Sequence, residues 1–211
     1  MSLNIKTSTG LERIHSVRIK PSGQPSYVSN GLQFISTELT GARQGTQEKI
    51  AVADYSNGYT LEVAFTATSA PPNTYGRLFE IREGNSSNAA TKSDLIALDT
   101  NKYELIINGS WKHSSDFEVS ISYNELVTAT LVVNSEQTAL LYHNGVLAQT
   151  FNSIGSIPSS RNNGVYWYIG CGSVASRTIN GTIHSVRLYN RVLTANEIAA
   201  NRAIDVAEFG S

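Results

Sequence analysis

The chain has 211 residues, with 16 lysine and arginine residues against 17 acidic ones and a formal net charge of −1. This balance excludes the clustered basic surface that nucleic-acid binding requires. Hydrophobic residues make up 40% of the chain and charged residues only 16%, which is opposite to the composition of disordered sequences. A folded domain is therefore expected, and single all-β domains of this length are common.

The ends of the chain and its cysteine content further limit the class of protein and the extent of the folded domain. Cys171 is the only cysteine, which excludes an intrachain disulfide. No segment reaches the roughly 18 consecutive apolar residues of a membrane-spanning helix, so no membrane contact is expected. Residues 1–3 are typical of a vector-derived start and residues 206–211 of a tail or linker, which leaves residues 4–205 as one expected domain.

Short apolar runs with period-two alternation recur along the chain and are separated by clusters of Gly, Asn, Ser and Pro. This pattern is typical of an all-β sandwich or barrel. The expected strands are 13–19, 31–36, 59–66, 76–83, 94–98, 103–107, 118–121, 126–133, 137–143, 146–149, 165–169 and 181–189.

Asn-Gly pairs mark several expected strand ends. Asn144-Gly145 separates two apolar runs, and both residue types tolerate a positive φ, which predicts a two-residue type I′ hairpin. Asn108-Gly109 and Asn180-Gly181 are expected to end other strands in the same way.

One short helix is predicted near the end of the chain. Thr194 and Glu197 form a Thr-x-x-Glu capping box, in which each side chain bonds the backbone N–H of the other residue. The helix is expected to run to about Arg202, with Leu193 packing on Ile198. Such a short helix must pack on the sandwich to be stable.

A hexapeptide nearly repeats, as Ile14-His-Ser-Val-Arg-Ile19 and Ile183-His-Ser-Val-Arg-Leu188. Two similar strands, paired at their edges so that the termini meet, would explain it. A relic of a tandem array, in which the first copy echoes the last strand of an upstream unit, would explain it equally. The flanking residues differ, so a second domain is not predicted.

The closing third of the chain resembles a known family. Tyr168-Ile-Gly-Cys-Gly172, followed by the run from Ile179 to Ile198, resembles the closing motif of bacterial laminin-G-like domains. Shorter matches at 31–34, 59–65 and 140–147 extend the resemblance from about Asn30 to Asp205. It implies the concanavalin A-like fold, a jelly-roll sandwich of two antiparallel sheets, here with one short C-terminal helix.

The same fold hosts glucanases, so catalysis is one alternative. Retaining glycosidases place two carboxylates about 5–5.5 Å apart, and a single strand can do so only with acids at i and i+2 or i+4. Glu80 and Glu83 are expected to face opposite sides of a strand, and Glu118 and Glu125 are too far apart. The domain is therefore predicted not to be an enzyme, unless different strands supply a pair.

Calcium is the metal that the resemblance favours, because several members of the fold carry it. Calcium prefers carboxylate and carbonyl oxygens, and the loop that contains Asp54 and Asn57 offers the best candidate ligands. Asp54 is more simply explained as a turn-forming residue, since Asx turns are common. The four histidines show no metal-binding spacing.

Sugar binding combines exposed aromatic rings with a few polar groups. Trp111 lies in a polar stretch after an expected turn, and Tyr75 borders a Pro-rich loop. Tyr166 and Tyr168 share one strand face, and Trp167 is expected to pack on the other. The candidate ligand-binding residues are Tyr75, Arg77, Trp111, Arg161, Asn162, Asn163 and Tyr166.

The leading hypothesis is a non-catalytic, lectin-like module that binds a carbohydrate or glycan. It would belong to a larger multidomain protein that is extracellular, at a bacterial cell surface or on a virion. The alternative is a structural, adhesion or protein-binding spacer in a multidomain surface protein or fibre, with a protein surface as its partner. A glycoside hydrolase is a more distant third hypothesis.

Overall fold

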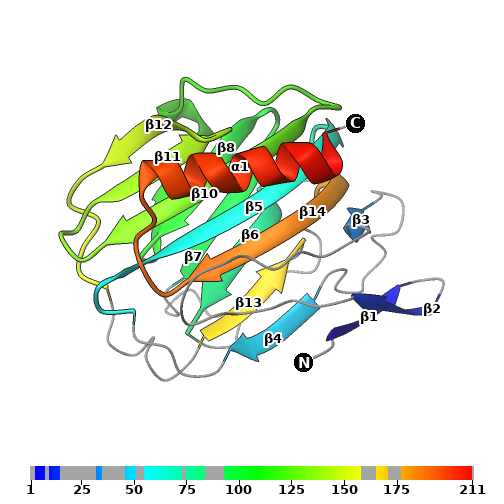
Figure 1. Ribbon diagram of the computed structural model, residues 1–211, viewed down its shortest axis with the longest axis horizontal. Coiled ribbons are helices and arrows are strands. Elements are labelled where there is room, and N and C mark those ends of the chain that lie inside the picture. Colours follow the sequence, from blue (N-terminus) through cyan, green and yellow to red (C-terminus); the bar gives the residue numbers. More distant parts are fainter. Residues whose placement is uncertain are drawn as a thin grey trace.

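The computed structural model describes residues 3–7, 10–14, 32–34, 46–50, 55–72, 75–83, 93–157, 165–170 and 177–210, the first four ranges by their backbone alone. Two antiparallel sheets face each other, and one helix covers the outer side of the nearer sheet (Figure 1). This arrangement confirms the expected jelly-roll sandwich. Among the described residues, no helix is long and apolar enough to cross a membrane.

The sheet beneath the helix, here sheet I, has the order β12-β11-β10-β5-β14-β3. Its strands are β3 (Leu32–Phe34), β5 (Gly58–Ser69), β10 (Leu126–Asn134), β11 (Ala139–His143), β12 (Val146–Phe151) and β14 (Asn180–Tyr189). The central pair β5 and β10 stays in register from Leu126 opposite Thr66 to Asn134 opposite Gly58. These two long, fully paired strands form the centre of sheet I.

The opposite sheet, here sheet II, has the order β4-β13-β6-β7-β8-β9. Its strands are β4 (Thr46–Ile50), β6 (Gly76–Arg82), β7 (Ser93–Asp99), β8 (Lys102–Ile107), β9 (Ser110–Lys112) and β13 (Val165–Ile169). β1 (Leu3–Thr7) and β2 (Gly10–Ile14) pair in a two-stranded sheet of their own. The rest of the first copy of the repeated hexapeptide lies outside the described residues.

The core fills the space between the two sheets with alternate residues of their strands. Its largest fully buried side chains include Tyr55, Tyr59, Tyr103, Phe65 and Phe79. Tyr59 of sheet I donates a hydrogen bond of 2.7 Å to Asp94 of sheet II, which satisfies two polar groups in the interior.

Two of the Asn-Gly turns form as expected. Asn144 and Gly145 have φ values of 53° and 81°, and Asn108 and Gly109 have φ values of 50° and 80°. Both residues of each pair are left-handed, which is the signature of a type I′ turn. The second turn leads into β9, a three-residue strand that the sequence did not predict.

Two expectations about strands were wrong. Residues 118–121 are not a strand, because Phe117 and Ile121 anchor the segment in the core and only one bridge, from Ser120 to Lys102, pairs it. Asn180-Gly181 opens β14 at a bulge and makes no turn. A Cβ on Gly181 would overlap the Thr66 carbonyl oxygen, so the close approach of the two strands requires glycine.

The helix α1 (Ala195–Phe209) begins with the expected capping box at Thr194 and Glu197. Leu193 and Ile198 pack in one apolar cluster on the outer side of sheet I, as predicted. The helix does not end near Arg202 but continues to Phe209, so most of the expected tail is helical. The buried contacts of Asp205 in the last turns explain this extension.

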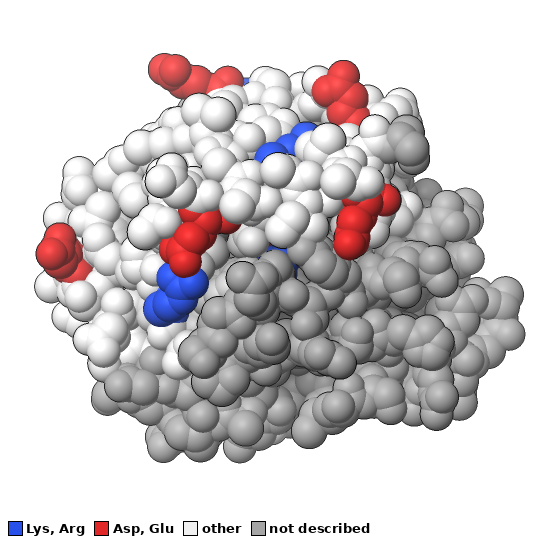
Figure 2. Space-filling model, in the orientation of Figure 1, with Lys and Arg blue, Asp and Glu red and all other residues white. Residues whose placement is uncertain are grey.

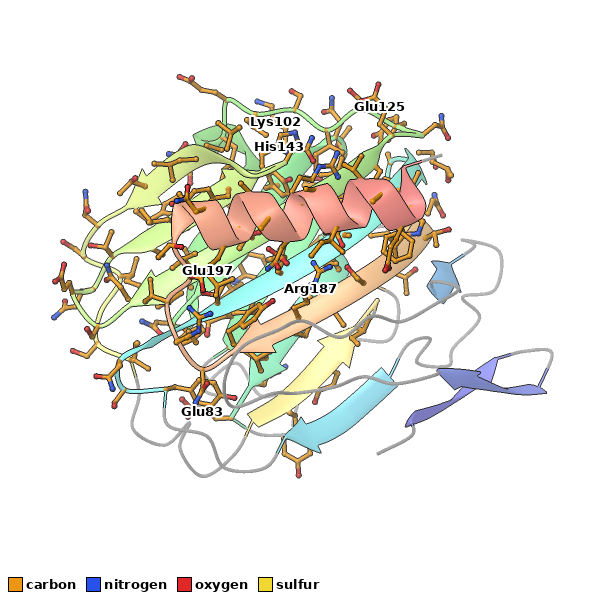
Figure 3. All side chains as sticks on the ribbon, in the orientation of Figure 1. Glu83, Lys102, Glu125, His143, Arg187 and Glu197 are labelled. Carbon is orange, nitrogen blue, oxygen red and sulfur yellow. The ribbon has the colours of Figure 1, made fainter. Side chains whose placement is uncertain are left out.

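A buried polar cluster joins α1 to sheet I, and Figure 3 labels its central residue, Arg187. The Arg187 guanidinium lies 2.6 Å from a Glu62 oxygen and donates a 3.1 Å hydrogen bond to Asp205. Thr130 donates to Glu62 and Thr128 to Asp205, so further hydrogen bonds satisfy both carboxylates. Burial raises the pKa of Glu62, and Arg187 opposes that rise. Arg187, which belongs to the closing motif, therefore links α1 to sheet I through Asp205 and Glu62.

Candidate functional site

The cross-strand register decides which side chains share the outer face of sheet II. Trp111 of β9 lies opposite Ile106 of β8, and Ile106 lies opposite Leu95 of β7. Leu95 lies opposite Glu80 of β6, and Tyr168 of β13 completes the row. Alternate residues of these strands belong to the core, so this row faces away from sheet I.

An aromatic pair lies at the edge of this outer face. The rings of Tyr75 and Trp111 have centroids 4.9 Å apart and planes inclined by 49°. Trp111 is 36% exposed and Tyr75 is half-buried. The His113 ring lies parallel to the Trp111 ring with centroids 6.1 Å apart. Aromatic and polar surface are thus combined at one accessible place.

The backbone around Tyr75 is strained and closely packed. Tyr75 has a φ of 66°, a left-handed conformation that is an outlier for a bulky side chain. At the next residue, Gly76, a Cβ would lie 2.6 Å from the Pro71 side chain and 2.8 Å from the Thr178 carbonyl oxygen. The close approach of these segments fixes the position of Tyr75. Strain of this kind is concentrated at functional sites.

Arginine side chains surround the buried carboxylate of Glu80. Arg77 Nη1 lies 2.7 Å from Glu80 Oε2, and Arg82 Nε lies 3.6 Å from Oε1. Burial raises the pKa of Glu80, whereas the positive charges of Arg77, Arg82 and Arg177 oppose the rise. The half-buried Arg177 guanidinium also lies 5.2 Å from the centroid of the Tyr75 ring. A cationic group therefore joins the aromatic pair.

A second carboxylate on this face is engaged by a histidine. Glu104 lies opposite Ala97, which in turn lies opposite Arg77, so all three share the outer face. His113 Nδ1 lies 2.8 Å from Glu104 Oε1, and the carboxylate is buried while the ring is exposed. Glu104 therefore holds His113, which in turn flanks Trp111.

The structure brings some of the predicted binding residues together. Tyr75 and Trp111 are in contact, and Arg77 lies buried beneath the site. Tyr166 is half-buried on the same outer face, opposite Arg82. The other candidates on the 161–163 stretch, Arg161, Asn162 and Asn163, lie outside the described residues.

The candidate calcium loop is described only in part. Asp54 lies outside the described residues, and Asn57 is exposed in the turn that Gly58 closes by donating a hydrogen bond to the Tyr55 carbonyl. Within the described ranges, no group of three or more acidic, histidine or cysteine side chains could hold a metal ion.

Sequence reasoning missed Arg177, Glu104 and His113 as members of the site. Arg177 lies far from Tyr75 along the chain, and no local pattern marks it. His113 could have been found, because it follows Trp111 by two residues and a strand places such residues on one face. The role of Glu104 could be recognised only once the register between β8 and β9 was known.

The other side of the molecule carries α1. Figure 2 shows that side, on which the described acidic and basic side chains are scattered and do not gather in one patch. The aromatic and arginine groups of sheet II, by contrast, lie in contact with one another.

A family model for the concanavalin A-like lectin/glucanases superfamily matches residues 40–199. The chain belongs to this family. The match covers β4 to the first part of α1, and thus every strand of the two sheets except β3. A search among curated proteins found no similar sequence.

Solved structures share the fold at low sequence identity. The CBM40 of the Ruminococcus gnavus IT-sialidase, bound to alpha2,3 sialyllactose, is 17% identical with a TM-score of 0.54 over 74% of this chain and 98% of that chain. A Trypanosoma rangeli sialidase is 17% identical with a TM-score of 0.60 over 87% of this chain but only 32% of that one. A Limulus polyphemus SAP-like pentraxin is 14% identical with a TM-score of 0.52 over 76% of each chain. These likenesses establish the fold.

Proposed function

We propose that this protein is a non-catalytic carbohydrate-binding module whose site is the outer edge of sheet II around Tyr75 and Trp111. The observation that carries the proposal is the tilted pair of these two rings, in which Trp111 is exposed and Tyr75 half-buried. Sugar rings have apolar faces that stack on aromatic side chains, while neighbouring polar groups bind the hydroxyls. His113 and Arg177 supply such polar groups beside the pair.

The fold family supports the same class of ligand. The similar CBM40 structure contains sialyllactose, and that module is matched along almost its whole length. By analogy, this chain would serve as the recognition module of a larger protein. Its place at a cell surface or on a virion is part of the proposal and rests on the sequence resemblance alone. The analogy concerns fold, so the site residues must carry the functional argument.

The surroundings of the buried acids support a non-catalytic role. Retaining hydrolysis needs two carboxylates about 5–5.5 Å apart that reach the substrate. Glu80 is held by arginines and Glu104 by His113. Glu62 and Asp205 share Arg187 beneath α1, where no sugar can reach them.

A glycan array followed by calorimetric titration tests the proposal. The wild-type protein should bind at least one glycan, and Trp111→Ala should weaken that binding by about tenfold or more, as for other central aromatic contacts. Leu147→Ala is the matched control, because Leu147 is an exposed apolar residue on β12 of the other sheet. Its affinity should equal that of the wild type.

Two results would overturn the proposal. Absence of binding across neutral, acidic and host-type glycans would favour the structural or adhesion module instead. Binding that survives Trp111→Ala unchanged would move the site elsewhere on the sandwich.

A further inference from the structure

The guanidinium of Arg177 is presented at the edge of the aromatic pair. It lies 5.2 Å from the centroid of the Tyr75 ring, and the Tyr75 ring contacts Trp111. A guanidinium that lies over a ring interacts with it through its positive charge and keeps N–H groups that can donate hydrogen bonds to a ligand. These donors are therefore positioned for a group that approaches beside the rings.

The backbone of Arg177 is fixed next to the site. The Arg77 amide donates a 3.2 Å hydrogen bond to the Arg177 carbonyl. The following residue, Thr178, is buried, and its carbonyl oxygen packs closely against Gly76. The segment thus runs beside the start of β6, where Tyr75 lies. Such preorganisation lowers the entropy lost on binding.

The nearby carboxylate of Glu80 is already engaged by other guanidinium groups. Its Oε2 lies 2.7 Å from Arg77 and its Oε1 lies 3.6 Å from Arg82. Arg177 still acts on Glu80 through its charge. Glu80 therefore orients the arginines beneath the site, while the Arg177 guanidinium lies over the Tyr75 ring.

We propose that the site prefers acidic sugars, with the Arg177 guanidinium binding the carboxylate of a sialic or uronic acid whose ring stacks on Trp111. This inference rests on the proposed function. The planar fork of arginine matches a carboxylate through two parallel charge-assisted hydrogen bonds, which are stronger than bonds to a neutral hydroxyl. An acidic sugar can therefore form charge-assisted hydrogen bonds with Arg177 that a neutral sugar cannot form.

Two matched pairs of probes test this preference and distinguish the source of the carboxylate. The first pair is 3′-sialyllactose and lactose, which differ by one sialic acid. The second pair is a hyaluronan oligosaccharide and its carboxyl-reduced form, which differ only in the uronic acid group. In calorimetric titrations, the acidic member of at least one pair should bind about tenfold more tightly than its neutral partner. This preference should weaken as salt is raised.

Arg177→Gln should abolish the preference while leaving the binding of the neutral probe unchanged. Arg191→Gln is the matched control, because Arg191 also lies over a tyrosine ring, 5.9 Å from the centroid of Tyr189, but is paired with Glu197 beside α1. That variant should keep the preference. Thermal unfolding of both variants should show that each is folded.

The outcomes separate this inference from the proposed function. Equal binding of acidic and neutral probes, or a preference that persists in Arg177→Gln, would overturn the inference and leave carbohydrate binding intact. Failure of these probes and of every array glycan to bind would overturn both.

Discussion

Tyr75 and Trp111 meet with ring centroids 4.9 Å apart, although β7 and β8 lie between β6 and β9 in sheet II. Tyr75 directly precedes β6 and Trp111 belongs to β9, so the contact requires Tyr75 to reach across the outer face of the sheet. The buried Ala97 and Ile106 lie on that face between the two strands. The aromatic pair is thus built by tertiary structure on a rigid sheet.

Replacing Tyr75 by glycine should separate binding from stability. Glycine relieves the left-handed strain at this position, which is worth roughly 1 kcal/mol. It also raises the conformational entropy of the unfolded chain, which lowers stability by a similar amount. We expect the free energy of unfolding to change by less than about 1 kcal/mol while glycan affinity falls about tenfold. Urea unfolding and calorimetric titration measure the two effects. A variant with full affinity would remove Tyr75 from the site.

Arg187→Met should destabilise the protein strongly. The change leaves the carboxylates of Glu62 and Asp205 buried without their shared cation. Removing one partner of a buried ion pair typically costs about 3–5 kcal/mol. Urea denaturation measures the loss, and helix content by circular dichroism should fall with it. A free energy of unfolding equal to that of the wild type would show that the cluster does not fasten α1.

Stability should decrease as the pH falls below about 6.5. Burial lowers the pKa of His184, with Asp205 partly opposing, and burial together with Arg202 lowers that of His143. The unfolded chain therefore takes up protons near the ordinary histidine pKa of 6.5, while the folded histidines resist protonation until a lower pH. Urea denaturation at pH values above and below 6.5 measures how steeply the free energy of unfolding changes with pH. A His143→Gln, His184→Gln double variant with the wild-type slope would contradict this account.

The capping box of α1 should contribute to stability in a pH-dependent way. Thr194→Ala should lower the free energy of unfolding by about 1 kcal/mol. A hydrogen bond from Arg191, with further bonds from Thr194, lowers the pKa of Glu197 to about 2 from 4.5. Its contribution is therefore complete above pH 4.5 and is lost as the pH falls toward 2.

Glu197→Gln measures this contribution, because it removes the charge and keeps the shape. The variant should be slightly less stable than the wild type at neutral pH and equally stable near pH 2. The difference should be small and should shrink in salt, since both side chains of the Arg191–Glu197 pair are about 40% exposed. A constant difference at all pH values would exclude the charge as its cause.

The strands and turns were largely predictable because their signals are local. The run 165–169 has the predicted bounds in β13, and the Asn144-Gly145 turn has the predicted φ signs. The end of α1 was not predictable, because Asp205 is held in place by Arg187 of β14 rather than by a local signal. Gly181 was misread as a turn because its close neighbour, Thr66, lies on another strand.

The site was predictable only in part for the same reason. Trp111 and Tyr75 were candidates because one stands in a polar stretch and the other beside a Pro-rich loop, and the structure places their rings in contact. Arg177 and Glu104 join them through the register of sheet II and the segment beside β6. Arg77 was predicted as a ligand-binding residue, but the bulge between Arg77 and Phe79 and the pairing with Glu80 place it beneath the site.

The indole N–H signal of Trp111 in nitrogen-15 NMR spectra tests the central claim most directly. Its assignment follows from the signal that disappears in Trp111→Phe. During titration with the glycan that binds most tightly, we predict that this signal shifts and saturates at the affinity measured by calorimetry. A Trp111 signal that stays unchanged while calorimetry records binding would contradict a sugar site at Tyr75 and Trp111.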